Sequence, residues 1–271
     1  MIWINGREQA TLFAGDRAVQ FGDGCFTTAA VNNGRILQLS AHMQRLREGC
    51  QRLLIGQVDW LQLGQEMQQL AEPQQQAVLK VIISRGQGGR GYSMTGCGEA
   101  TRILSLAPYP QHYQALRSTG VKLTLSPIAL ARSRLLAGIK HLNRLEQVLI
   151  RAHLDQSDAD EALVLDTEGR VVECCAANLF WRKGGQVFTP SVEQAGVDGT
   201  MRRYLMAQMM QSGQTCHVVS VGKDVVLDAD EVVICNALMP VLPVRELDDK
   251  RYTGRSLFDL LYASCNKMEA K

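Results

Sequence analysis

The chain has 271 residues, of which 46% are hydrophobic, so it is long enough to bury a substantial core in one large or two modest domains. Its 29 basic and 27 acidic residues leave a net charge of only +2, which gives no overall field that would favour nucleic acid or an anionic membrane. Any anionic ligand must therefore be bound by a local cluster of donors.

The first hundred residues alternate short strands with helices. Strands are expected at 2–4 and 34–39, each beside a turn-forming Asn-Gly pair. Apolar residues at helical spacing predict a helix over 40–54, and a second helix is expected over 60–70, ahead of a proline. The β-branched apolar run at 77–84 predicts an interior strand, so this part of the chain is mixed α/β.

Residues 86–91, Gly-Gln-Gly-Gly-Arg-Gly, formally match the G-x-G-x-x-G fingerprint of dinucleotide-binding proteins directly after a strand. That fingerprint requires its last glycine to open a helix. Here residues 92–98 are rich in helix breakers, and another strand is expected at 102–107. We therefore favour a glycine-rich connection between two strands, with a nucleotide-dependent oxidoreductase as the alternative.

Two prolines two residues apart, Pro108 and Pro110, resist both helix and central strand and mark a domain boundary. We expect a small α/β domain over 1–107, an interdomain linker over 108–120 and a larger, β-rich domain over 121–271. In the larger domain, helices are predicted at 144–154, at 200–210 and from near 256. The first of these has Leu145, Val148, Leu149 and Ala152 on one side. Strands are predicted at 121–126, 162–165, 171–175, 179–182, 187–189, 218–221 and 232–235.

The eight cysteines are scattered, and no CxxC pair or Cys/His cluster has the spacing of a metal site. We therefore expect reduced thiols and no metal. The first residues lack a basic stretch followed by an apolar one, and no run has the length that spans a bilayer. A cytoplasmic protein without membrane or nucleic-acid partners is the resulting expectation.

Lys140 lies in an apolar run, Leu135-Leu136-Ala137-Gly138-Ile139-Lys140. Desolvation lowers a lysine's pKa, which gives the neutral amine needed for covalent chemistry with a carbonyl group and for proton transfer. The alternative is a lysine whose stem packs on apolar surface while its ammonium reaches water. Lys80 is also flanked by apolar residues, but it is expected in the middle of a strand without a polar helper.

Two further features suit a bound pyridoxal phosphate, which needs an acid facing its ring nitrogen and several donors for its phosphate. Glu173 ends a predicted strand among small neutral residues, where the alternative is a solvated hairpin glutamate. Residues 195–202 join a glycine-containing loop to a helix start, which suits a phosphate but is also an ordinary turn. Arg45 would supply the positive charge that this loop lacks.

These segments occur in an order and spacing that resemble the fold-type IV pyridoxal-phosphate enzymes, the family of branched-chain and D-amino acid aminotransferases. The matching residues are Arg45 in His42-Met43-Gln44-Arg45-Leu46, Lys140 in Lys140-His141-Leu142-Asn143, Glu173 with Asn178, and Gly196-Val197 ahead of Arg202. Segments 20–28, 89–93, 138–147, 173–181 and 235–240 are similar to the branch of the family that cleaves 4-amino-4-deoxychorismate.

The resemblance implies a two-domain α/β architecture with pyridoxal 5'-phosphate between the domains, and a homodimer. Lys140 would carry the cofactor as a Schiff base and move protons, and Glu173 would face the ring nitrogen. The other implied contacts are Asn143 near the ring hydroxyl; Arg45, the amides of Val197 and Asp198, and Asn236 at the phosphate; and Arg90 and Tyr92 at a substrate carboxylate.

The implied reaction is the cleavage of 4-amino-4-deoxychorismate to 4-aminobenzoate and pyruvate, a step towards folate. An aminotransferase acting on branched-chain or D-amino acids would share Lys140 and Glu173 and is the nearest alternative. A non-catalytic binding protein is an alternative of another class.

Overall fold

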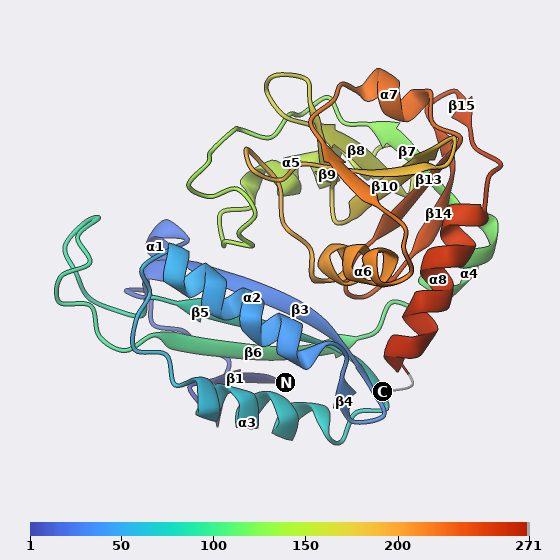
Figure 1. Ribbon diagram of the computed structural model, residues 1–271. Coiled ribbons are helices and arrows are strands. Elements are labelled where there is room, and N and C mark those ends of the chain that lie inside the picture. The colour runs from blue at the N-terminus through green and yellow to red at the C-terminus, as the bar shows by residue number, and fades with distance from the viewer. Residues whose placement is uncertain (270–271) are drawn as a thin grey trace. The chain divides into compact units, whose positions relative to one another are not determined.

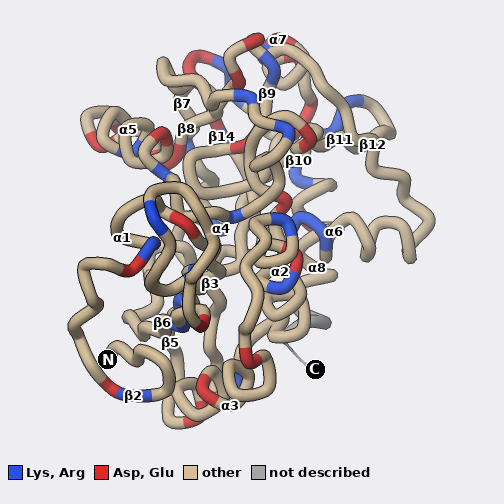
Figure 2. Tube along the Cα trace, turned by 90° about the vertical axis from the view of Figure 1, so that its left-hand side faces the viewer, with Lys and Arg blue, Asp and Glu red and all other residues tan. Residues whose placement is uncertain are grey.

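The computed structural model describes residues 1–269, with side chains as far as Cys265, and the chain divides into two compact units. Unit 1 contains residues 1–109 together with 139–143, and unit 2 contains 110–138 and the chain from 144 onward. The fold is mixed α/β with one sheet in each unit (Figure 1). Basic and acidic positions are interspersed along the trace (Figure 2).

Unit 1 is built on a six-stranded antiparallel sheet in the order β2-β1-β6-β5-β3-β4. Its helices α2 and α3 pack on one face of that sheet. The elements are β1 (Ile2–Ile4), β2 (Arg7–Glu8), α1 (Arg17–Phe21), β3 (Gly24–Asn32), β4 (Arg35–Ile36), α2 (Leu39–Arg52), α3 (Trp60–Ala71), β5 (Gln76–Ser84) and β6 (Thr101–Pro108).

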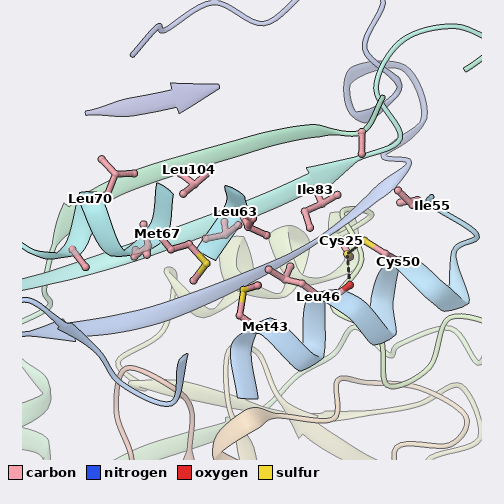
Figure 3. Close-up of a cluster of buried hydrophobic side chains, with 14 of the residues drawn as sticks. Cys25, Met43, Leu46, Cys50, Ile55, Leu63, Met67, Leu70, Ile83 and Leu104 are labelled. Carbon is pink, nitrogen blue, oxygen red and sulfur yellow. Dashed lines mark hydrogen bonds between the residues drawn. The ribbon is translucent and has the colours of Figure 1, made fainter. Parts of the chain in front are cut away.

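The core of unit 1 follows from the alternation of β3. Cys25 points towards the helices and is buried, whereas Phe26, the next residue, points to the opposite face of the sheet. Leu46 of α2 and Leu63 of α3 are fully buried against this inner face (Figure 3). The outer face is therefore the one on which polar side chains of the sheet remain accessible.

The glycine run 86–91 connects β5 to β6, and the next regular element after it is that strand rather than a helix. Five glycines between 86 and 96 have positive φ, which keeps the segment irregular. The expected connection between strands is thus confirmed, and the nucleotide fingerprint lacks the helix on which it depends.

Unit 2 contains a nine-stranded mixed sheet in the order β12-β11-β10-β13-β14-β7-β8-β9, with β15 paired to β14. Its largest fully buried side chains are Trp181 and Phe180. The elements are α4 (Tyr113–Thr119), β7 (Val121–Leu125), α5 (Leu145–Leu154), β8 (Glu161–Leu165), β9 (Val171–Cys174), β10 (Asn178–Lys183), β11 (Gln186–Pro190), α6 (Thr200–Gln211), β12 (Cys216–Val219), α7 (Lys223–Leu227), β13 (Glu231–Cys235), β14 (Leu242–Leu247), β15 (Lys250–Arg251) and α8 (Ser256–Glu269).

The segments around the domain boundary are assigned differently from the sequence expectation. Residues 110–120, expected as part of a linker, contain α4 and belong to unit 2. Residues 139–143, expected within the larger domain, belong to unit 1 because their backbone pairs with the start of β3. Pro108 and Pro110 mark where the chain leaves the first sheet. They carry no information about the later segment 139–143, which returns to that sheet.

Helix α5 presents its apolar side outwards. Leu145, Val148 and Leu149 are 77%, 59% and 56% exposed, and the helix is anchored instead by buried Ile150 and Leu154. None of the described helices combines the length and apolar character needed to cross a lipid bilayer.

Candidate active site

Residues 139–143 lie beside the start of β3. The amide of Phe26 donates to the carbonyl of Lys140 at 2.9 Å, and the amide of Leu142 donates to the carbonyl of Gly24 at 3.0 Å. Ile139 is buried in the core of unit 1, which anchors the segment from its N-terminal end. The backbone of Lys140 is therefore held on both sides by hydrogen bonds or packing.

The side chain of Lys140 is half-buried, and its Nζ lies 4.8 Å from the ring centroid of Phe26. The Nζ of Lys80, on β5, lies 5.1 Å from the same centroid. An ammonium over an aromatic face is attracted by the ring quadrupole. Phe26 thus aligns two amines on the outer face of the sheet, and of the two only Lys80 is exposed.

Asn143 ties the Lys140 segment to the turn after α1. Its Nδ2 donates to the carbonyl of Gly22 at 3.1 Å. Gly22 has a φ of +61°, and a Cβ there would lie 2.6 Å from Asn143 Oδ1. The turn therefore requires glycine both for its left-handed backbone and for the approach of the asparagine.

In unit 2, Glu173 on β9 is 5% exposed, and its Oε2 accepts a hydrogen bond from the amide of Val197 at 2.8 Å. Arg144, at the N-cap of α5, was not singled out in the sequence. Burial lowers the pKa of its guanidinium, while the nearby negative charges of Glu173 and Glu146 act to raise it. The residues next to Glu173 in the sequence include no nearby cation. Arg144, the arginine that interacts electrostatically with Glu173, comes from the start of α5.

The loop before α6 is held by short hydrogen bonds within unit 2. Gly138 donates to the carbonyl of Gly196 at 2.9 Å, and the amide of Asp198 donates back to Gly138 at 3.1 Å. The amides of Val197 and Asp198, expected to bind a phosphate, thus donate to Glu173 and Gly138 in this structure. A short β-bridge between Gly138 and Val197 orients them this way.

The N-terminus of α6 offers a different donor set. Thr200, its first residue, is 3% exposed, and its Oγ1 has no hydrogen-bond partner among the described residues. A buried hydroxyl without a partner is costly unless a ligand or water supplies one. Together with the first-turn amides of a twelve-residue helix, it forms a donor set that suits a phosphate. A hydroxyl residue directly after a loop glycine was the signal for Thr200 in the sequence.

Asn236 organises the turn after β13. Its Oδ1 accepts from the amides of Leu238 and Met239, both at 2.8 Å, and its Nδ2 donates to the carbonyl of Ala176 at 3.0 Å. Both the oxygen and the nitrogen of the side-chain amide are therefore hydrogen-bonded to the backbone. The family resemblance had instead implied that this side chain contacts a phosphate. Ala176 lies in the turn between Glu173 and Asn178, so the two turns are joined.

Glu161, also not singled out in the sequence, supports the same turn. Its carboxylate accepts from the amides of Ala162 at 2.8 Å, Cys175 at 3.0 Å and Ala176 at 2.7 Å. Burial raises the pKa of Glu161 to about 7, although the three amide hydrogen bonds act to lower it. The buried carboxyl group of Glu161 thus fixes the backbone of the turn that follows Glu173.

Arg45 is half-buried on α2, three residues after His42. Burial, and then the charge of Arg45, lowers the pKa of His42 to about 3. The neutral imidazole lies with its Nδ1 2.6 Å from the hydroxyl of Thr27. The positive charge of Arg45 thus lies near a neutral, buried histidine.

Arg90 and Tyr92 lie on the exposed connection between β5 and β6, and Tyr92 is 88% exposed. The ring of Tyr92 lies 5.5 Å from that of Phe21 on α1. Both predicted substrate residues therefore belong to unit 1, as Lys140 does.

Residues 24–247 match the family model for amino-transferase class IV. The chain is 38% identical to aminodeoxychorismate lyase of Vibrio harveyi over 90% of each chain, and 26% identical to D-alanine aminotransferase of Bacillus licheniformis over 89% of this chain and 85% of that one. The fold matches 4-amino-4-deoxychorismate lyase from Pseudomonas aeruginosa with a TM-score of 0.93, at 37% identity over 98% of each chain. The chain therefore belongs to the amino-transferase class IV family.

Proposed function

We propose that the chain is a pyridoxal-phosphate-dependent carbon–oxygen lyase that converts 4-amino-4-deoxychorismate to 4-aminobenzoate and pyruvate. The observation that carries this proposal is its likeness, over nine tenths of both chains, to the Vibrio harveyi lyase. The aminotransferase relatives match at lower identity, which favours the lyase over an aminotransferase on the same scaffold.

The donor set of the chain fits the cofactor. The N-terminus of α6 and the buried Thr200 hydroxyl suit its phosphate. The family resemblance implies Arg45 as the cation that would join them. The Val197 and Asp198 amides join this set only if they exchange their present partners. Asn236 contributes by fixing the turn at Ala176 rather than by a side-chain contact.

When bound, pyridoxal phosphate supplies an electron-accepting ring that stabilises negative charge on the carbon next to the substrate nitrogen. Glu173 would hold a proton on the ring nitrogen, and Asn143 would lie near the ring hydroxyl. Lys140 would hold the cofactor through its amine, which is free for proton transfer while substrate is bound.

The freed Nζ of Lys140 then takes the proton from the substrate carbon that carries the nitrogen. The electron pair of that C–H bond forms the last double bond of the aromatic ring as the neighbouring C–O bond breaks. Lys140 delivers its proton to the departing enolpyruvyl group, which becomes pyruvate, so one C–H and one C–O bond are lost without an oxidant. Arg90 and Tyr92 bind a substrate carboxylate.

The activity is tested by supplying 4-amino-4-deoxychorismate and measuring 4-aminobenzoate and pyruvate, with an amino acid plus 2-oxoglutarate as a parallel assay. Equal amounts of the two products, with little keto-acid exchange, are expected. Efficient exchange without 4-aminobenzoate would instead establish an aminotransferase.

The role of Lys140 is tested by borohydride reduction of the holoenzyme followed by peptide mass analysis. The cofactor mass is expected on Lys140 and not on Lys80, which contacts the same Phe26 ring. Lys140→Ala is expected to abolish turnover in a folded protein, whereas Lys80→Ala retains it. Cofactor mass on any other lysine would refute the assignment.

We also propose a homodimer that works in the cytoplasm. The exposed apolar side of α5 is a surface that a second copy would cover, and Leu135, in the segment before Lys140, is a further apolar residue at 83% exposure. The eight cysteines are thiols in the structure, which suits a reducing compartment.

A further inference from the structure

Arg17 is a buried cation that contacts the exposed glycine-rich connection. It is the first residue of α1 and is 4% exposed. Its Nη1 donates to the carbonyl of Gly91 at 3.0 Å and to that of Ser93 at 3.2 Å. These carbonyls belong to the residues on either side of Tyr92, so one guanidinium fixes the backbone at the tip of the connection, at the left of Figure 1.

The same guanidinium also reaches Tyr92 through an aromatic ring. The central carbon of Arg17 lies 4.8 Å from the ring centroid of Phe21, which is one turn later on α1. The Phe21 ring in turn contacts the Tyr92 ring at 5.5 Å, tilted by 56°. Tyr92 is thus positioned both by its flanking carbonyls and by its ring, and both contacts lead back to Arg17.

The guanidinium of Arg17 is itself held by an ion pair with Asp23. Its Nε donates to Asp23 Oδ2 at 2.8 Å, and Arg85 donates to the same carboxylate at 2.7 Å and 3.0 Å. Burial acts to raise the pKa of Asp23, but the hydrogen bonds and charges of Arg85 and Arg17 outweigh it and hold that pKa below its usual value. Helix α1 is capped by the fully buried Asp16, which accepts from the hydroxyl of Ser84.

The turn after α1 also contacts the Lys140 segment. Gly22 accepts from Asn143, and Gly24 accepts from the amide of Leu142. The residues from Arg17 to Gly24 are therefore bonded to two segments at once, the one that carries the proposed catalytic lysine and the one that carries Arg90 and Tyr92.

We propose that Arg17 is a positioning residue for substrate recognition, which fixes the connection 86–99 so that Arg90 and Tyr92 meet the carboxylate of an anionic substrate. The inference rests on the proposed function. Arg17 is too buried to touch the substrate, and the glycines of the connection would otherwise leave it many conformations. Hydrogen bonds from a charged donor are among the strongest available to hold backbone carbonyls.

The decisive comparison is Arg17→Lys against Arg85→Lys in the holoenzyme. Both changes weaken contacts to Asp23, but only Arg17 touches the connection. Arg17→Lys is expected to raise KM for 4-amino-4-deoxychorismate by about tenfold while kcat changes by less than about twofold. Arg85→Lys is expected to leave KM at the wild-type value.

A second readout is independent of activity. Trypsin cleaves after Arg90, on the exposed connection, and the rate of that cut reports how firmly the connection is held. Arg17→Lys is expected to speed this cleavage several-fold relative to wild type and to Arg85→Lys, with or without cofactor. Phe21→Leu, which keeps the hydrogen bonds of Arg17 but removes the ring contact, is expected to give a smaller change in the same direction.

Unchanged KM and unchanged cleavage in Arg17→Lys would overturn the inference. If Arg17→Lys does not fold, the test is made with Phe21→Leu. Wild-type KM and a wild-type cleavage rate in that variant would also overturn the inference. A wild-type protein that makes no 4-aminobenzoate would refute the proposed function instead, and faster tryptic cleavage of Arg17→Lys would still support the structural part of the inference.

Discussion

The carboxylate of Glu173 accepts the amide hydrogen of Val197, so the acid proposed for the ring nitrogen is bonded to the loop that leads into α6. Gly196, immediately before Val197, is bonded to Gly138. A hydrogen bond of 2.8 Å to a buried carboxylate is strong and fixes the orientation of its acceptor. Substitutions in this loop should therefore affect both the acid and the proposed phosphate site.

Replacing Glu173 by Gln separates charge from geometry. The Gln Oε1 still accepts the Val197 amide, but the negative charge that keeps a proton on a ring nitrogen is lost. We expect kcat to fall by at least about 100-fold, a typical size for losing a proton-holding group. Thermal unfolding serves as the control and should change little. A variant with wild-type kcat would show that Glu173 does not face the ring.

Gly196→Ala tests the close approach of the loop to β9. Gly196 has a φ of +82°, and an added Cβ would contact Val172 and lie 3.2 Å from Glu173 Oε2. Gly213→Ala is a matched control, because Gly213 has a φ of +78° with nothing within 4 Å. We expect a loss of roughly 1 kcal/mol of unfolding free energy at Gly213 and about twice that at Gly196.

Cofactor affinity should fall in Gly196→Ala and not in Gly213→Ala, which a titration of the apoenzyme measures. Equal effects of the two substitutions on stability and on cofactor affinity would mean that the loop can move away from Glu173 without cost.

Glu161 predicts a pH dependence of stability. Its pKa is raised to about 7 in the folded chain, so its stabilising contribution is complete below the unfolded value of 4.5 and is lost as the pH rises through about 7. The unfolding free energy of wild type minus that of Glu161→Gln should therefore decline by up to about 1.4 kcal/mol per pH unit between these values. Denaturant unfolding at pH 5, 6 and 7 measures it.

His42 gives the opposite slope, because its pKa is lowered to about 3 in the folded chain. His42 is present in both wild type and Glu161→Gln, so its contribution cancels in the difference between their unfolding free energies. A difference between wild type and Glu161→Gln that stays constant from pH 5 to pH 7 would contradict the assignment of the titration to Glu161.

Val148→Glu tests the proposed subunit contact. A charge placed on the apolar side of α5 would be desolvated in a dimer interface, and we expect the dimer dissociation constant to rise at least about 100-fold. Val225→Glu on α7, where the valine is 45% exposed, is the matched control and should leave assembly unchanged. Sedimentation equilibrium compares the two. A Val148→Glu protein that dimerises as tightly as wild type would place the contact elsewhere.

Much of the fold was predictable from local patterns. The β-branched apolar run at 77–84 and the helical spacing at 40–54 correspond to β5 and α2. The two-domain α/β architecture implied by the family resemblance is confirmed by the match to the Pseudomonas aeruginosa lyase. The spacing of Leu145, Val148 and Leu149 predicted one side of α5, but spacing alone does not say whether an apolar side meets a core or solvent.

The site was predictable where residue type alone carries chemistry. The family resemblance is confirmed, and the roles given to Lys140 and Glu173 remain predictions. Arg144 and Glu161 were not predictable, because each acts through a neighbour that only the tertiary fold supplies. The same holds for Arg17, whose two carbonyl acceptors on the connection are more than 70 residues away in the chain.

The pairing of residues 139–143 with the start of β3 bears on how this gene can be divided. A split after Tyr109 would give a first product without the proposed catalytic lysine and a second product whose lysine has lost the strand that supports its backbone. Neither half would be an autonomous module for shuffling or fusion. Ancestral duplication or exchange of one half would therefore have had to preserve all three passages of the chain between the units.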